Sequence, residues 1–167
     1  MKPLEPPDSH HLESALGWLE LGNHVEANEE LKKIAPELQA HPAVLAMRYE
    51  VHAKARNWDV AAETADALVR VAPEQASAWI CLAYATRRKT GGGIPQAREI
   101  LLRAQPKFPD QGLIPFNLAC YECQLGNFDQ AKKWLAQAFA IGDAKELKRM
   151  ALADPDLEPM RKQIAEM

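Results

Sequence analysis

Two cysteines three residues apart, Cys120 and Cys123, are the side chains in this sequence that most suggest chemistry. A Cys-x-x-Cys pair can bind a metal ion or exchange with a disulfide. A structural zinc site uses four ligands, however, and the sequence offers only one further cysteine, Cys81, with all five histidines in the first third of the chain. No strand signal precedes the pair, unlike a thioredoxin-type site, so we interpret both thiols as small buried side chains. A thiol redox or metal sensor through this pair stays open as an alternative, while no metal site and no cofactor are predicted.

Catalytic residue combinations are not recognisable elsewhere. Gly91-Gly92-Gly93 lacks the Lys and Ser/Thr spacing of a phosphate-binding loop. Ser14 and Ser77 have no His and Asp context that would indicate a nucleophile. We therefore expect that the protein is not an enzyme and has no catalytic residues.

Composition narrows the class of partner. The 167 residues carry a net charge of -3 and are 47% hydrophobic, which is ordinary for a globular protein. This balance argues against a nucleic-acid or anionic-membrane partner, and no apolar run approaches the roughly 20 residues of a membrane span. The first residues show no apolar signal segment, and an odd number of cysteines fits a reducing compartment, so a cytoplasmic location is expected.

Small and apolar residues recur at nearly constant spacing and predict the elements that position these side chains. Ala27, Ala61, Ala97 and Ala131 are 34, 36 and 34 residues apart, and further small or apolar residues follow each of them after four and seven positions. This spacing places each set on one face of a helix. We call them the repeat positions: Ala27, Leu31, Ile34, Ala61, Ala65, Leu68, Ala97, Leu101, Ala104, Ala131, Leu135 and Ala138.

Turn residues precede every set of repeat positions. Gly22-Asn23, Arg56-Asn57 and Gly126-Asn127 occupy this place, and Gly91–Gly93 occupies it in the third unit. Each unit is therefore expected to be a helix, a tight turn and a second helix. The predicted division is a flexible lead at 1–7, hairpins at 8–41, 42–75, 76–111 and 112–143, and C-terminal capping helices at 144–167. In the last segment, Leu157, Met160 and Ile164 are expected to line an amphipathic helix.

These units resemble the tetratricopeptide repeat (TPR), as found in small bacterial-type proteins. Two units match best, through Trp79, Leu82, Ala83, Ala97, Leu101, Ala104 and Pro109, and through Leu118, Ala119, Gly126, Phe128, Ala131, Leu135 and Ala138. The resemblance covers roughly residues 8 to 143. It implies an all-α fold, an α-solenoid in which about four antiparallel helix pairs form a right-handed superhelix.

The resemblance also implies a function, since the first helices of TPR hairpins line a concave groove that receives a peptide or a helix. We expect a non-catalytic protein-interaction scaffold, with a secretion or assembly chaperone as the alternative. Tyr84 and Phe116 with Arg87 and Arg88 would suit a peptide that has an acidic group and an apolar anchor, unless the two aromatic rings are buried between helices. Exposed apolar residues such as Trp18 also leave a homodimer open. The groove residues implied by register are Glu50, Lys54, Ile80, Tyr84, Arg87, Arg88, Phe116, Asn117, Cys120, Cys123 and Gln124.

Overall fold

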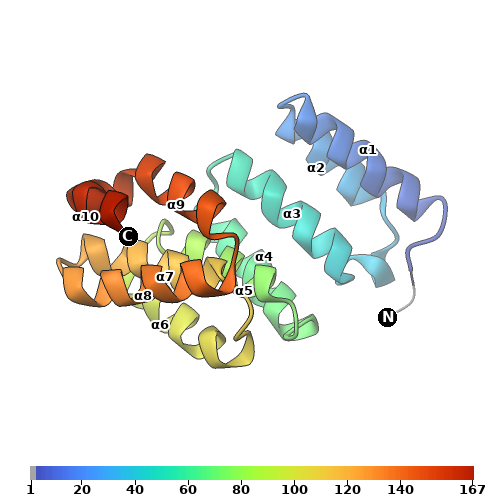
Figure 1. Cartoon of the computed structure of the whole chain (residues 1–167). Helices are drawn as coiled ribbons and strands as arrows, with labels where there is room; N and C mark the ends of the chain where they lie inside the picture. Colours follow the sequence, from blue (N-terminus) through green and yellow to red (C-terminus); the bar gives the residue numbers. More distant parts are fainter. Residues whose placement is uncertain (1–2) are drawn as a thin grey trace. The chain divides into compact units, whose positions relative to one another are not determined.

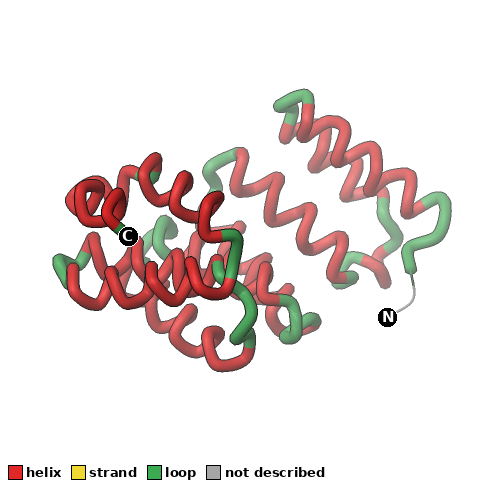
Figure 2. The backbone as a smooth tube through the Cα atoms, viewed as in Figure 1, coloured by secondary structure: helices red, strands yellow, loops and turns green. Residues whose placement is uncertain are grey.

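The computed structural model describes residues 3–167, and in this range all regular secondary structure is helical (Figures 1 and 2). The predicted all-α class is thus confirmed. Residues 1 and 2 of the predicted lead lie outside the described residues. The prediction of one amphipathic helix through Leu157 is wrong in detail. Residues Pro155–Met160, which include Pro155 and Pro159, form a 3-10 helix.

The chain divides into two compact units at the triple glycine, between Gly91 and Gly92. This boundary lies inside the predicted 76–111 hairpin, so the two helices of that hairpin belong to different units. The first unit contains α1 (Asp8–Glu20), α2 (His24–Lys33), the 3-10 helix η1 (Pro36–Leu38), α3 (Pro42–Lys54), α4 (Trp58–Val71) and α5 (Ala76–Thr86). The second unit contains α6 (Ile94–Ala104), η2 (Gln105–Lys107), α7 (Leu113–Gln124), α8 (Phe128–Ile141), α9 (Ala144–Ala153), η3 (Pro155–Met160) and α10 (Arg161–Glu166).

Tight turns fold consecutive helices back on each other, as the α1–α2 and α7–α8 pairs illustrate (Figure 1). Gly22, Arg56 and Gly126 all have positive φ at the end of the preceding helix. The next residue in each turn is an asparagine, whose N–H reaches back to a carbonyl five residues earlier. This hydrogen bond satisfies an otherwise unpaired helix-end carbonyl, which explains why a left-handed residue followed by Asn recurs in the sequence.

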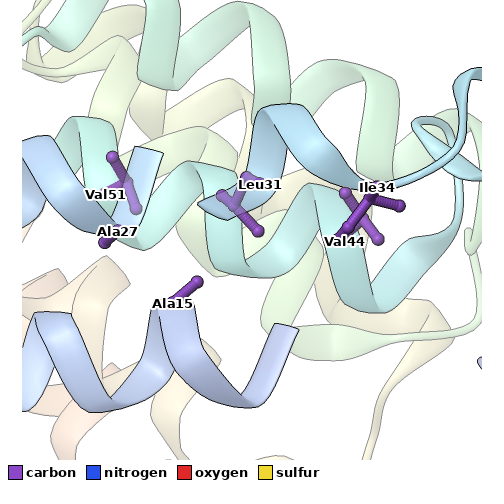
Figure 3. Close-up of a cluster of buried hydrophobic side chains, with 6 residues drawn as sticks. All are labelled: Ala15, Ala27, Leu31, Ile34, Val44 and Val51. Atoms are coloured by element: carbon purple, nitrogen blue, oxygen red, sulfur yellow. The ribbon is translucent and has the colours of Figure 1, made fainter. Parts of the chain in front are cut away.

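Every repeat position is buried. In the first unit, Ala15 of α1 belongs to one apolar cluster with Ala27 and Leu31 of α2 and with Val44 and Val51 of α3 (Figure 3). Small side chains let the paired helices approach closely, while each fully buried leucine contributes roughly 1.5 to 3 kcal/mol. The repeat positions therefore form the buried faces of α2, α4, α6 and α8.

A buried carboxylate lies in the second unit. Glu122 of α7 is only 1% exposed, and its two oxygens accept hydrogen bonds from Arg98 Nε at 2.7 Å and from Asn127 Nδ2 at 2.8 Å. These bonds join α6, α7 and the turn before α8. Because burial of an unpaired carboxylate is costly, the two donors are what make this residue acceptable on an inner face.

Candidate partner-binding surface

A pocket of about 370 Å³ opens on the first unit between α3 and α5. The sequence-predicted residues Glu50, Lys54, Ile80 and Tyr84 all line it. We call it the α3–α5 pocket; its complete lining is Tyr49, Glu50, Ala53, Lys54, Trp58, Ile80, Cys81 and Tyr84. Apolar walls with a few charged groups at the edge are typical of sites that receive an apolar side chain.

Two aromatic rings form one wall of the α3–α5 pocket. The rings of Trp58 and Tyr84 meet edge to face, with centroids 5.7 Å apart. Tyr84 is 40% exposed, so the structure places this ring at the surface and not between helices. The guanidinium of Arg88 lies 3.5 Å from the Tyr84 centroid, and its Nη1 donates to the Tyr84 carbonyl at 3.0 Å. Stacking on Tyr84 holds the Arg88 charge beside the pocket.

The charged groups at the pocket are of both signs. Lys54 is exposed, and its ammonium forms no ion pair with any residue that the structure describes. Glu50 supplies one carboxylate to the lining. Burial, aided by the nearby Glu50 carboxylate, raises the pKa of the Cys81 thiol to about 11. This thiol is therefore protonated at neutral pH, whereas reactive cysteines have lowered pKa values.

The predicted groove residues of the second unit lie in a different environment. Phe116, Cys120 and Cys123 of α7 are buried. Residues 154–160 lie against this helix: the Cys120 thiol donates to the Asp154 carboxylate at 3.7 Å, and Gln124 Nε2 donates to the Asp156 carbonyl at 2.9 Å. We call residues 154–160 the covering segment. Neighbouring parts of the chain thus cover the two cysteines.

Two further predicted residues lie outside the lining of the α3–α5 pocket. The side-chain amide of Asn117 donates to the Leu113 carbonyl at 2.7 Å, one turn earlier in α7. Arg87 is half-buried at the end of α5. Sequence reasoning missed Tyr49, Trp58 and Cys81 as pocket residues. Trp58 occupies the apolar position just after the turn, and that position beside a predicted groove helix was the available signal.

The cysteines do not form the pair that their spacing suggested. None of the three is in a disulfide, and Cys120 lies nearest to acidic groups: its sulfur and one oxygen each of Asp154 and Asp156 are within 4.8 Å of one another. One thiol with two carboxylates differs from the four nitrogen and sulfur ligands of a structural zinc site. Burial, with the charges of Asp156 and Asp154, raises the pKa of the Cys123 thiol, which again disfavours a thiolate.

Comparisons with known proteins agree with the helical-hairpin arrangement. No protein-family model matches the chain, and no curated protein matches it. A solved structure of a thermophilic TPR protein from Thermus thermophilus is similar with a TM-score of 0.75 and 22% identity, covering 95% of this chain and 86% of that one. The MamA RS-1 ArsTM double mutant is similar with a TM-score of 0.69 and 16% identity, covering 90% of this chain and 80% of that one.

Both solved structures align with nearly the whole chain, and one of them is itself described as a TPR protein. Among the described residues, no helix is both long and apolar enough to cross a bilayer. Identities this low establish the fold alone. The helical hairpins, the buried repeat positions and the structural likeness together show that this chain has the TPR fold.

Proposed function

We propose that the protein is a non-catalytic scaffold that binds a protein partner through the α3–α5 pocket. The observation that carries this proposal is the open apolar wall there: Tyr84 is 40% exposed beside a cavity of about 370 Å³. A cavity of this size can take one or two apolar side chains of a peptide or a helix. Exposed aromatic residues beside a pocket are also the residue type that dominates binding energy at protein interfaces.

The chemistry of the pocket supports binding in preference to catalysis. Its one thiol, Cys81, has a pKa of about 11, so it is a poor nucleophile near neutral pH. Burial also raises the pKa of the Tyr49 hydroxyl, which keeps this group protonated. The Glu50 carboxylate in the lining raises the pKa values of both groups further, so it does not favour the deprotonated form of either. The three cysteines without disulfides fit a reducing compartment, and we propose a cytoplasmic location on that basis.

Affinity capture from the native cell tests this function when wild type is compared with matched variants. Tyr84→Ala removes the exposed ring, and Ile80→Glu places a charge in the pocket. Leu125→Ala is the control, because Leu125 is an exposed apolar residue outside the pocket. We expect a partner that wild type and the control retain and that both pocket variants lose.

Binding of that purified partner should then weaken at least about tenfold for Tyr84→Ala. The melting temperature of this variant should fall by no more than a few degrees, because the ring is already partly in solvent. A partner that both pocket variants retain would rule out the α3–α5 pocket as its site.

A further inference from the structure

The faces of α5 and α7 correspond residue by residue in the repeat. Leu82 and Ala83 of α5 match Leu118 and Ala119 of α7 at a constant separation of 36 residues. The same separation relates Ile80, Tyr84 and Arg88 to Phe116, Cys120 and Gln124. The first three belong to or flank the α3–α5 pocket, and the second three lie on the face next to the covering segment.

The covering segment has a distinct chemistry. Its sequence is Asp-Pro-Asp-Leu-Glu-Pro-Met, with three carboxylates around a leucine and two prolines that limit its backbone freedom. Leu157 is 0% exposed and Met160 is also buried, so the apolar residues form the contact. The polar contacts come from Asp154 and from the Asp156 carbonyl, to the residues that correspond to Tyr84 and Arg88. The second unit therefore shows what kind of segment this face of a repeat accepts.

The open face has stronger complementarity for such a segment than the covered one. Where α7 has the uncharged Cys120 and Gln124, the corresponding residues are the aromatic Tyr84 on α5 and the cation Arg88 just after α5 ends. Lys54 adds a second cation from α3. Glu50 is the single carboxylate that opposes them in the pocket lining. Both Arg88 and Lys54 would favour an acidic segment over a neutral one.

We propose that the α3–α5 pocket binds an acidic, proline-flanked leucine segment of a partner protein, similar in chemistry to residues 154–160. The leucine enters the pocket beside Trp58 and Tyr84, and the carboxylates lie toward Lys54 and Arg88. The occupant is a segment from a partner, because the chain's own Leu157 is fully buried in the second unit. This inference rests on the proposed scaffold function and specifies the chemistry of its ligand.

The probe is a fluorescein-labelled peptide with the sequence of Ala153–Arg161, titrated into the full chain and followed by fluorescence anisotropy. We expect saturable binding that weakens at least about tenfold with Tyr84→Ala, since the ring is the main apolar contact. Lys54→Glu should weaken binding about threefold or more and reduce its dependence on salt. Because Lys54 is exposed, this variant keeps its fold, and Leu125→Ala should bind the peptide as wild type does.

Two altered peptides separate this inference from the proposed function. A peptide with Leu157→Ala should bind at least about tenfold more weakly, because it lacks the anchor. A peptide with Asp154→Asn, Asp156→Asn and Glu158→Gln should bind more weakly, by a factor of about three or more. Equal binding of the peptide that lacks the three carboxylates would overturn the acidic preference and leave the scaffold function standing. If no peptide bound but a native partner was still captured in a Tyr84-dependent way, this inference would be overturned and the proposed scaffold function would stand.

The test also excludes other occupants. If added peptide replaced the covering segment on α7, Leu157→Ala in the full chain would strengthen peptide binding and Tyr84→Ala would leave it unchanged, which would contradict binding at the α3–α5 pocket. If light scattering showed a dimer that Tyr84→Ala dissociates, a second copy would be the occupant and the proposal would be wrong. A monomer that binds the peptide in a Tyr84-dependent way is the expected result.

Discussion

Tyr84 of α5 and Cys120 of α7 hold the same place in the repeat, yet Tyr84 is 40% exposed and Cys120 is 3% exposed. On the inner faces of both helices, the corresponding residues Ala83 and Ala119 are 0% exposed. The opposite faces differ because the covering segment lies on α7, whereas the α3–α5 pocket stays open. A repeat thus determines how its helices pack, while residues outside the repeat determine which face can bind a partner.

The largest expected effect comes from removing the anchor of the covered face. Leu157→Ala should lower the free energy of unfolding of the second unit by about 2 to 4 kcal/mol, because a fully buried leucine leaves a cavity. Chemical denaturation measures this change. Labelling of Cys120 and Cys123 by a thiol reagent should also accelerate about tenfold, as the segment opens more often.

Leu152→Ala is the matched control, since Leu152 lies just before the covering segment and is exposed. It should cost less than about 1 kcal/mol and leave the labelling rates unchanged. Wild-type labelling rates in Leu157→Ala would mean that α7 stays covered without this side chain, and the contrast between the two faces would then need another cause.

Removal of the buried Glu122 carboxylate should have the next largest effect on stability. Glu122→Ala should lower the free energy of unfolding by about 2 kcal/mol, because it removes the acceptor that Arg98 and Asn127 share. We place the value below that of a fully buried pair, because the Arg98 side chain is 30% exposed and water can reach it.

Glu99→Ala tests the same arginine from the solvent side. Glu99 lies 3.2 Å from Arg98 Nη1 but is exposed, so its removal should cost no more than about 0.5 kcal/mol. Thermal unfolding of both variants measures the difference. Equal losses would show that the buried hydrogen bonds of Glu122 contribute no more than the exposed Arg98–Glu99 ion pair.

A smaller effect on stability is expected at the turns that precede α4 and α8. Arg56 has a φ of 56°, while Gly126 has a φ of 80° at the equivalent turn. Left-handed backbone is unfavourable for a residue with a Cβ, so Arg56→Gly should raise the free energy of unfolding by about 1 kcal/mol. The reverse change, Gly126→Ala, should lower it by a similar amount, although its Cβ would meet open space. Unfolding midpoints that move in the same direction would disprove this strain argument.

The smallest perturbation is a change of pH around the open pocket. Since burial raises the pKa of Cys81 to about 11, its thiolate fraction should grow roughly tenfold for each pH unit between 7 and 10. Alkylation at Cys81, resolved by peptide mass, should follow this rise and level off near pH 11. A plateau near pH 8 would indicate an activated thiol and would favour the sensor alternative over the scaffold.

Local spacing explains which features could be predicted from the sequence. The buried Ala and Leu set and the Gly-Asn turns depend on contacts between residues close in the chain, and their periodicity is visible in the sequence. That register placed Glu50, Lys54, Ile80 and Tyr84 on a predicted groove, and all four line the α3–α5 pocket. Whether Cys120 was open or buried was not predictable, because its cover comes from the covering segment, 34 residues further along the chain.

The division at Gly91 and Gly92 was also not predicted. Three consecutive glycines are compatible both with a tight turn inside a hairpin and with a boundary between two units, since glycine restricts the backbone little in either case. The contact of Leu157 with α7 was also not predicted. The spacing of Leu157, Met160 and Ile164 suits an amphipathic helix, and this pattern outweighed the prolines at 155 and 159. In the structure this stretch is a 3-10 helix, and the buried face it presents depends on α7.

The covering segment has a consequence for how copies of this chain behave at high concentration. Its inner side hides Leu157 and Met160, while Glu158, Arg161 and Lys162 next to them are exposed. An uncovered α7 would present an apolar row to any complementary surface on another molecule, and such head-to-tail contacts generate open filaments when their geometry does not close. The seven residues of the covering segment thus replace an apolar surface of α7 with one that is bordered by exposed charges.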